Sequence, residues 1–450
     1  MSNTLINDLL KGINNCSCGK NHNVSIEDVV IETGAIHKVP VWLKENNYKN
    51  IYVISDKNTH KACGAQLTNI LKDDSIFSVS NLIYNREKDL IPNEIAIAEI
   101  LINLPKNTDI IVAVGSGVIN DTCKFVAHKL NIPYIIVGTA PSMDGYASNT
   151  SAMTINNLKS SLAGTLPKVI FADLDVLQQS PSYLVLAGFG DIVGKYSALK
   201  DWRLSQILNG EYLCEDIFSI VKEATDNVCS HAENIKNRTP EGMKALMDTL
   251  ILTGIAMSYV GNSRPASGSE HHFSHYLEIQ ALFDDIQIPL HGTKVAANTV
   301  LSERLREKFV KEIDTLDLDN LSEFNLDEWI KTTKIKYRAA SEEVLSLNEK
   351  KNLLSQDARK QRIESFKINK DKIVEVLTTS PSSKELIDLL ETVGLGYDYP
   401  YIDMDIVCDA VIYAKDLRDR YTIAHLLYDL DLSKEYSEYV RELYSVKENI

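Results

Sequence analysis

The first 180 residues of the chain alternate short apolar runs, rich in β-branched residues, with segments of helix length. The runs that are suited to buried strands lie at residues 51–56, 110–114, 134–137 and 168–172. Helix-length segments, such as 93–104 and 121–130, separate them. This alternation is typical of a parallel sheet whose strands are joined by crossover helices.

The strand pattern ends near residue 180, and helical periodicity follows it. We therefore expect an α/β domain over residues 1–180 and an all-helical domain over residues 181–450. Residues 311–378 are highly charged, first acidic and then lysine-rich, which indicates solvated helix faces and a loop in a charged C-terminal extension.

The composition restricts the partners and the compartment of the protein. The 450 residues carry a formal net charge of −15, which disfavours nucleic acid and anionic membranes as partners. We find no signal-peptide pattern and no apolar run near the roughly 20 residues of a membrane-spanning helix. The seven cysteines show no framework spacing, which indicates a reducing cytoplasm.

Three histidines stand close together in the helical half of the chain. The S-x-x-E spacing of residues 267–270 is that of a capping box, which predicts a helix start. His271 and His275 are then four residues apart on one face of that helix, and His291 follows a proline-containing break. Asp191 lies upstream between glycines. Two imidazoles and one carboxylate are a common ligand set for a catalytic divalent metal ion.

A second group of polar and glycine residues follows the expected strands. Gly115-Ser116-Gly117 comes directly after a strand and opens a helix, where backbone N–H groups attract an anion, although a plain strand-to-helix turn explains it as well. Asp56 ends another strand. It can bind a ribose diol, which favours NAD over NADP, or it can cap a helix. Residues 138–148 form a polar turn at a third strand end, where ligands bind in open α/β sheets.

Near the N-terminus, Cys16, Cys18 and His22 have the spacing of three ligands in a small metal knuckle. A fourth ligand is not evident in the sequence. We expect reduced cysteines in a tight turn here and keep a metal site as the alternative.

Taken in chain order, these motifs resemble those of one family. They are Gly115-x-Gly117-x-x-x-Asp121-x-x-Lys124, Thr139-Ala140-Pro141-Ser142-Met143-Asp144-Gly145, Gly190-Asp191, Ser267-Gly268-Ser269-Glu270-His271-x-Phe273-Ser274-His275 and His291-Gly292. The chain resembles bacterial sn-glycerol-1-phosphate dehydrogenases, in the superfamily of dehydroquinate synthase, glycerol dehydrogenase and iron-dependent alcohol dehydrogenases. The likeness covers about residues 25–305, and residues 418–423 resemble the tail of the bacterial form.

The resemblance implies a dehydroquinate synthase-like fold, with a Rossmann-like dinucleotide-binding domain followed by a helical domain for metal and substrate. It implies reversible hydride transfer between NAD(P)H and dihydroxyacetone phosphate, a small phosphorylated three-carbon substrate, to give sn-glycerol 1-phosphate. It also implies one divalent ion, zinc or nickel, and a homodimer.

The resemblance also implies roles for individual residues. Asp191, His271 and His291 correspond to metal ligands. Asp144, Asp191 and His275 correspond to substrate contacts, of which Asp191 and His275 are catalytic. The residues that correspond to cofactor contacts are Asp56, Gly117, Val118, Ile119, Asn120, Asp121, Thr139, Ala140, Pro141, Ser142 and Ser148.

Physical chemistry supports the metal independently of the family, because a divalent cation stabilises the negative charge that hydride transfer builds on a ketone oxygen. We expect His275 to hydrogen-bond the substrate or to relay its proton. Arg264, Lys195 and Lys294 are candidates for binding the substrate phosphate.

The sequence departs from the family pattern at two positions. Ser116 stands where the superfamily commonly has glycine, and His272 replaces a usually apolar residue. Two alternatives stay open, a glycerol or polyol dehydrogenase of the same superfamily and a non-catalytic nucleotide-sensing protein.

Overall fold

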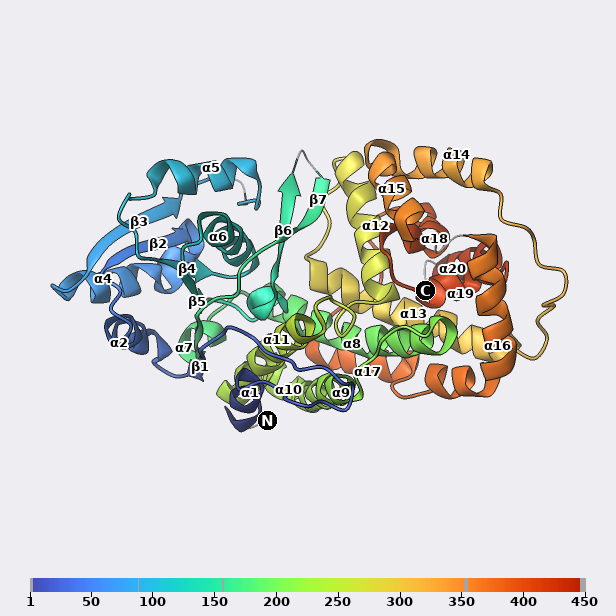
Figure 1. Cartoon of the computed structure of the whole chain (residues 1–450), viewed down its shortest axis with the longest axis horizontal. Coiled ribbons are helices and arrows are strands. Elements are labelled where there is room, and N and C mark those ends of the chain that lie inside the picture. Colours follow the sequence, from blue (N-terminus) through green and yellow to red (C-terminus); the bar gives the residue numbers. More distant parts are fainter. Residues whose placement is uncertain (1–2, 88, 156–157, 352–354, 446–450) are drawn as a thin grey trace. The chain divides into compact units, whose positions relative to one another are not determined.

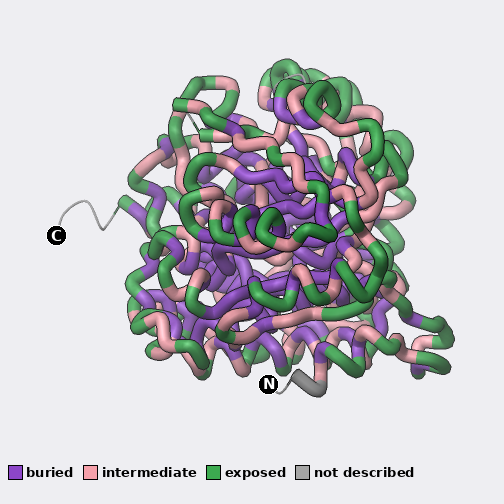
Figure 2. Tube along the Cα trace, turned by 90° about the vertical axis from the view of Figure 1, so that its left-hand side faces the viewer, coloured by how far each residue is buried: buried purple, intermediate pink, exposed green. Residues whose placement is uncertain are grey.

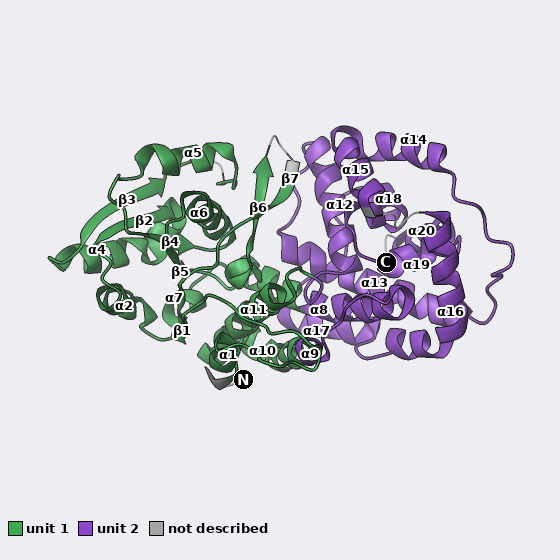
Figure 3. Ribbon diagram, in the orientation of Figure 1, with its two compact units in different colours: residues 1–192, 219–263 green, residues 193–218, 264–450 purple. Residues whose placement is uncertain are grey.

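A computed structural model describes residues 3–87, 89–155, 158–351 and 355–445 (Figure 1). Buried and exposed backbone alternate along the chain, and the buried stretches gather in the interior of the fold (Figure 2). The chain forms two compact units (Figure 3). Unit 1 comprises residues 1–192 and 219–263, and unit 2 comprises residues 193–218 and 264–450.

Unit 1 contains a six-stranded sheet in the order β1-β8-β5-β4-β2-β3, and every pair of neighbours is parallel. The strands are β1 (Asp28–Glu32), β2 (Asn50–Asp56), β3 (Ser78–Tyr84), β4 (Ile110–Gly115), β5 (Tyr134–Gly138) and β8 (Val169–Asp173). A separate antiparallel hairpin joins β6 (Thr150–Ile155) to β7 (Leu158–Ala163). The parallel α/β architecture that the sequence predicts is confirmed.

The strands that the sequence predicts are the central ones and β8. β4 and β5 are buried along their whole length, so they are apolar throughout. β1 and β3 were missed. They form the two edges of the sheet and are only partly buried, and polar residues keep their apolar runs to three residues, Val29–Ile31 in β1 and Leu82–Tyr84 in β3.

Helices cover both faces of this sheet. Val53, Val112 and Val137 on one face share a core with Leu43 of α2 and Leu67 of α4. α5 and α6 lie on the opposite side in Figure 1. The helices of this region are α1 (Asn3–Leu10), α2 (Val39–Glu45), α3 (Lys57–Thr59), α4 (Ala65–Asp73), α5 (Glu94–Asn103), α6 (Gly117–Leu130) and α7 (Leu174–Gln178).

No strand follows β8 in the part of the chain that the structure describes. The helices that follow are α8 (Ser182–Asn209), α9 (Glu215–Ser230), α10 (Ala232–Lys236), α11 (Pro240–Val260), α12 (Ser269–Phe283), α13 (His291–Glu312), α14 (Leu326–Tyr337), α15 (Ser341–Lys351), α16 (Gln356–Leu377), α17 (Ser383–Val393), α18 (Met404–Tyr413), α19 (Ile423–Asp429) and α20 (Ser433–Ser445). The helices of residues 219–263 belong to unit 1, so the compact units do not follow one cut near residue 180.

α11 is long and apolar enough to cross a membrane by length and composition alone, with a mean hydropathy of 1.3. The sequence expectation that no run approaches that length therefore understated this segment. Because 83% of its most apolar window is buried within the fold, α11 has the environment of a core helix.

Candidate active site

The helix that carries the first two histidines begins differently from the predicted capping box. α12 starts at Ser269, and its N-cap is Gly268, which has no side chain to make a capping hydrogen bond. The prediction that Ser267 caps this helix is therefore wrong. Instead, the backbone N–H of Ser269 donates to Oδ2 of Asp201 at 2.7 Å. Glu270 still contributes to the helix start, because its Oε1 accepts a hydrogen bond from the backbone N–H of Gly268, the N-cap residue, at 2.7 Å.

The three histidines of α12 and α13 face one another. The ring centroids of His271 and His291 are 5.0 Å apart, those of His275 and His291 are 5.3 Å apart, and those of His271 and His275 are 6.2 Å apart. Because two turns of α12 and the first residue of α13 supply these rings, a few backbone positions fix the whole cluster.

Each of these rings has a carboxylate behind it. Nδ1 of His271 lies 2.7 Å from Oε1 of Glu270, and Nδ1 of His291 lies 3.0 Å from Oε1 of Glu278. Oε2 of Glu278 lies 3.3 Å from Nδ1 of His275. A carboxylate accepts hydrogen bonds, so Nδ1 of each ring donates and Nε2 keeps its lone pair for another partner. This is the arrangement in which histidines bind metal ions.

Asp191 lies on α8, near the end of the first segment of unit 1. Its Oδ2 accepts a hydrogen bond from the backbone N–H of Asp144 at 3.1 Å. One ligand atom each of Asp191, His271 and His291 lie within 4.8 Å of one another. One carboxylate oxygen and two imidazole nitrogens are donors that suit zinc and nickel, so the residues present fit a divalent ion.

His275, Glu278 and His291 also lie within 4.8 Å of one another. Both oxygens of Glu278 already accept hydrogen bonds from the two histidines, and Nζ of Lys294 lies 3.3 Å from Oε1. A carboxylate so occupied orients its neighbours, which makes this second group a support for the first.

The electrostatics of α12 separate its histidines and acids. Burial lowers the pKa of His275 to about 3, and the charge of Arg418 lowers it further against the opposing effect of Glu278. Burial raises the pKa of Glu270, but hydrogen bonds from His271 and Ser197 outweigh it and hold this pKa below its ordinary value. His275 is therefore neutral and Glu270 is ionised at neutral pH.

His272 faces away from this cluster and is fully buried. Its ring packs edge-on against His425, with centroids 6.4 Å apart, and neither ring nitrogen has a hydrogen-bond partner in the described chain. Burial and nearby cations hold its pKa well below the ordinary value. The departure from the family pattern at this position is thus accommodated in the core.

Two of the expected phosphate-binding cations are engaged by the protein itself. The guanidinium of Arg264 donates to both oxygens of Glu211, at 2.7 and 2.5 Å, and to the carbonyl of Tyr421 at 2.9 Å. Lys294 contacts Glu278 and the carbonyl of Pro289. The third, Lys195, is fully buried on α8.

Arg418 and Arg420 lie in the segment that resembles the tail of the bacterial form, and the sequence pattern predicted no role for them. Burial lowers the pKa of both, and the charges of Arg264 and Arg418 help to bring that of Arg420 to about 10. Both side chains keep some solvent exposure, and the charge of Arg418 acts on His275. Arg418 therefore brings positive charge to the histidine cluster, and Arg420 acts on the neighbouring His272.

The expected nucleotide end lies in unit 1, at the start of α6. Ser116 is the N-cap and makes no side-chain capping bond, so the first N–H groups of α6, at Gly117, Val118 and Ile119, have no partner within the helix. Free N–H groups at a helix start fit the pyrophosphate of a dinucleotide. The N–H of Thr139 donates to the carbonyl of Gly115 at 3.1 Å, which joins this turn to the end of β5.

Three of the expected cofactor residues instead connect parts of the scaffold. Nδ2 of Asn120 donates to the carbonyl of Gly145 at 3.3 Å. Buried Lys124 pairs with Asp121 at 3.2 Å and donates to Oγ of Ser148 at 3.3 Å. These contacts fix the segment after β5 on α6.

The turn at residues 139–142 presses directly on α8. A Cβ atom added to Gly188 would lie 1.8 Å from the carbonyl oxygen of Pro141, so only glycine allows this approach. The carbonyl of Ala140 accepts the hydroxyl of Tyr146 at 2.7 Å, and the N–H of Ser142 donates to the same carbonyl at 3.0 Å. A backbone N–H and the hydroxyl of Tyr146 thus hold the turn.

Asp56 acts as a helix cap. Its Oδ1 accepts the N–H groups of Asn58 and Thr59 at 2.8 and 2.9 Å, in a capping box at the start of α3. Both of these hydrogen bonds are made by Oδ1. The second carboxylate oxygen, Oδ2, lies at the carboxyl end of β2, where ligands bind in open α/β sheets.

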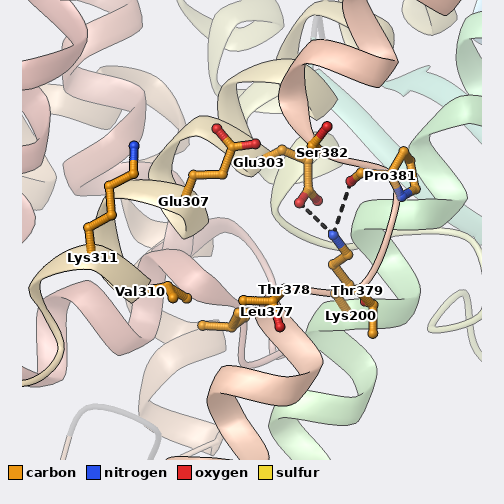
Figure 4. Close-up of a pocket in the computed structure, with 10 residues that line it drawn as sticks. All are labelled: Lys200, Glu303, Glu307, Val310, Lys311, Leu377, Thr378, Thr379, Pro381 and Ser382. Atoms are coloured by element: carbon orange, nitrogen blue, oxygen red, sulfur yellow. Dashed lines mark hydrogen bonds and ion pairs between the residues drawn. The ribbon is translucent and has the colours of Figure 1, made fainter.

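A cavity of about 250 Å³ lies elsewhere in unit 2, where α8, α13 and the turn before α17 meet (Figure 4). Lys200 pairs there with Glu303 at 2.6 Å and donates to the carbonyl of Pro381 at 3.3 Å. None of the expected site residues lines this cavity, so it is not the candidate active site.

The chain is similar to several known proteins. Residues 30–181 match the family described as iron-containing alcohol dehydrogenase. Glycerol-1-phosphate dehydrogenase [NAD(P)+] of Bacillus licheniformis is 35% identical over 301 residues, 66% of this chain and 75% of that protein. The Bacillus subtilis protein of that name is 34% identical over 304 residues, 67% and 75% of the two chains. An iron-containing alcohol dehydrogenase structure from Thermococcus thioreducens shares the fold, with a TM-score of 0.60, 14% identity and coverage of 92% and 98%.

Proposed function

Because the chain belongs to the glycerol-1-phosphate dehydrogenase family, we propose that it is a metal-dependent sn-glycerol-1-phosphate dehydrogenase. It transfers hydride reversibly between NAD(P)H and dihydroxyacetone phosphate. The observation that carries the proposal is the convergence of Asp191, His271 and His291, whose ligand atoms lie within 4.8 Å of one another.

A zinc or nickel ion held by these three residues would stabilise negative charge on the ketone oxygen of the substrate. The chain supplies the orientation. Glu270 and Glu278 fix the rings of His271 and His291, and the N–H of Asp144 holds Oδ2 of Asp191. Rings and carboxylate therefore need no rearrangement before the substrate binds.

His275 acts as a hydrogen-bond partner for the substrate hydroxyl. Its Nδ1 donates to Glu278, so Nε2 is an acceptor, and the low pKa of the ring keeps it neutral. A neutral acceptor of this kind can take a hydrogen bond from the substrate hydroxyl and so orient it, whereas a ring with so low a pKa does not keep the proton itself.

The cofactor binds through backbone and carboxylate groups. The N–H groups of Gly117, Val118 and Ile119 bind the pyrophosphate, and the turn at 139–142 lies beside them. Oδ2 of Asp56 accepts the ribose hydroxyls and repels a 2′-phosphate, which favours NAD over NADP. With the cofactor held there, it would supply or accept hydride at C4 of the nicotinamide, opposite C2 of the substrate.

Arg418 and Arg420 bind the phosphate of the substrate. Their neighbouring charges repel each other, and a phosphate dianion would relieve that repulsion. Arg418→Ala should raise the KM for dihydroxyacetone phosphate roughly 10-fold or more, since a charge-assisted hydrogen bond contributes about 1.5–3 kcal/mol. The KM for NADH should stay unchanged in this variant. In the exposed control Arg441→Ala, the KM values for dihydroxyacetone phosphate and for NADH should both stay unchanged.

The test of the function compares dihydroxyacetone phosphate with dihydroxyacetone as acceptors for NADH. We expect strong preference for the phosphate ester and a product with the sn-1 configuration. Equal use of the two acceptors would identify a polyol dehydrogenase instead, and no turnover with either would favour a nucleotide-sensing protein.

We also propose a cytoplasmic homodimer that acts without nucleic acid or membrane. The net charge of −15 supports this view, since it repels both polyanions. Light scattering after size-exclusion chromatography measures the oligomeric state directly.

A further inference from the structure

Cys16, Cys18 and His22 come together with a residue from a distant part of the chain. Their ligand atoms and Sγ of Cys214 all lie within 4.8 Å of one another. Cys214 directly precedes α9, and its carbonyl accepts the N–H of Phe218 at 2.9 Å in the first turn of that helix. This group shares no residue with the candidate active site.

A tight loop brings the first three of these side chains together. Ile13 and His22 form an antiparallel bridge, with N–H to carbonyl distances of 2.9 and 3.0 Å. The N–H of Gly19 donates to the carbonyl of Cys16 at 2.9 Å, and Gly19 has a φ of +79°, in the left-handed region that favours glycine. The loop therefore points two sulfurs and one ring inward.

The imidazole of His22 has the orientation of a metal ligand. Its Nδ1 lies 3.2 Å from the carbonyl oxygen of Tyr259, and the two rings stack with centroids 5.4 Å apart. Because a carbonyl only accepts, Nδ1 carries the proton and Nε2 offers its lone pair. Nε2 lies 3.3 Å from Sγ of Cys18, on the side of the sulfurs.

Three of the four residues are buried in the protein, and Cys18 is partly exposed. The exposed fractions of Cys16, His22 and Cys214 are 6%, 1% and 0%. None of the seven cysteines forms a disulfide, and binding of a divalent ion would displace the protons of the three thiols. Three thiolates and one imidazole form a closed tetrahedral set, the type that binds structural zinc and leaves no position for substrate.

We propose that Cys16, Cys18, His22 and Cys214 bind a structural zinc ion. The ion ties the N-terminal loop, which has little regular structure of its own, to the start of α9 and to Tyr259 at the end of α11. Since its ligands differ from those of the active site, this proposal does not rest on the proposed catalytic function.

Cobalt substitution tests the proposal, because only sulfur ligands give the near-ultraviolet charge-transfer band of cobalt thiolates. Asp191, His271 and His291 contain no sulfur, so an ion in the active site does not contribute. Wild-type protein loaded with cobalt should show the band and bind one more ion per chain than Cys18→Ser and Cys214→Ser. The matched control Cys229→Ser, which removes a cysteine of α9 outside the group, should keep both.

Absence of the thiolate band in cobalt-loaded wild-type protein would overturn the proposal, as would equal metal content in wild type and Cys214→Ser. The wild-type spectrum does not depend on whether a variant folds. His22→Cys should retain the ion and show a stronger sulfur band. The site would also be contradicted if this variant lost the ion and if mild thiol alkylation left the metal content of the wild-type protein unchanged.

Discussion

The nucleotide end of unit 1 and the histidine cluster of unit 2 prepare for their ligands in opposite ways. At the start of α6 the groups offered are backbone N–H groups, packed beside a backbone turn that leaves no room for a Cβ at Gly188. Around α12 they are side chains, each held by a further side chain. The first design is sensitive to added bulk, and the second is sensitive to the loss of a single polar atom.

The largest expected effect comes from removing a side chain that contacts the ion. His271→Ala should lower kcat by at least about 1000-fold, since a metal ion contributes several kcal/mol to charge stabilisation. NADH affinity, followed by fluorescence titration, should stay unchanged because the cofactor contacts lie in unit 1. The exposed control His128→Ala should keep full activity, and substantial turnover by His271→Ala would break the distinction between the two regions.

The next effect should come from adding one carbon to the backbone-built region. Gly188→Ala places a Cβ 1.8 Å from the carbonyl oxygen of Pro141. We expect the free energy of unfolding to fall by roughly 1–3 kcal/mol, as for other overpacked positions, with weaker NADH binding. Urea denaturation and fluorescence titration measure the two quantities.

Gly117→Ala is the matched control for that variant. Its added Cβ would lie 3.5 Å from Cγ of Met143, an ordinary contact, so stability should not change. Weaker NADH binding at unchanged stability would place the pyrophosphate at this turn, whereas unchanged binding would remove Gly117 from the cofactor site.

A smaller effect is expected from the carboxylate that supports two rings. Glu278→Gln keeps the shape of the side chain but removes the charge that accepts from His275 and His291. The metal affinity should fall about 10–100-fold, as for other partners of metal-binding histidines. Activity measured against free metal concentration reports the shift, and the exposed control Glu442→Gln should show none.

The smallest effect concerns cofactor choice. Asparagine also caps helices, so Asp56→Asn should keep α3 intact while removing the charge near the ribose. We expect the ratio of kcat/KM for NADPH to that for NADH to rise several-fold. An unchanged ratio would mean that Asp56 serves only as a helix cap.

The comparison also explains which features the sequence could predict. Continuous apolar runs predicted the buried strands β2, β4, β5 and β8, whereas the half-exposed edge strands β1 and β3 lacked that pattern. The spacing of His271 and His275 predicted their shared helix face because it is a local property of the helix.

Features that depend on residues distant in the sequence were not predicted. The cap of α12 comes from Asp201 on α8, so the local S-x-x-E pattern misled. Glu278 supports rings on two helices, and Cys214 joins three residues of the N-terminal loop. Only the three-dimensional fold brings such distant residues together. Their residue types, carboxylates and a cysteine, were the one signal in the sequence that they could cap a helix, orient a histidine or bind a metal ion.

The most direct test of the proposed function follows NADH oxidation by dihydroxyacetone phosphate before and after removal of the active-site ion. We predict that chelation abolishes turnover, that zinc or nickel restores it in the wild type, and that neither restores it in Asp191→Ala. Full activity in completely chelated protein would contradict the account, because Asp191, His271 and His291 would then have no ion to hold.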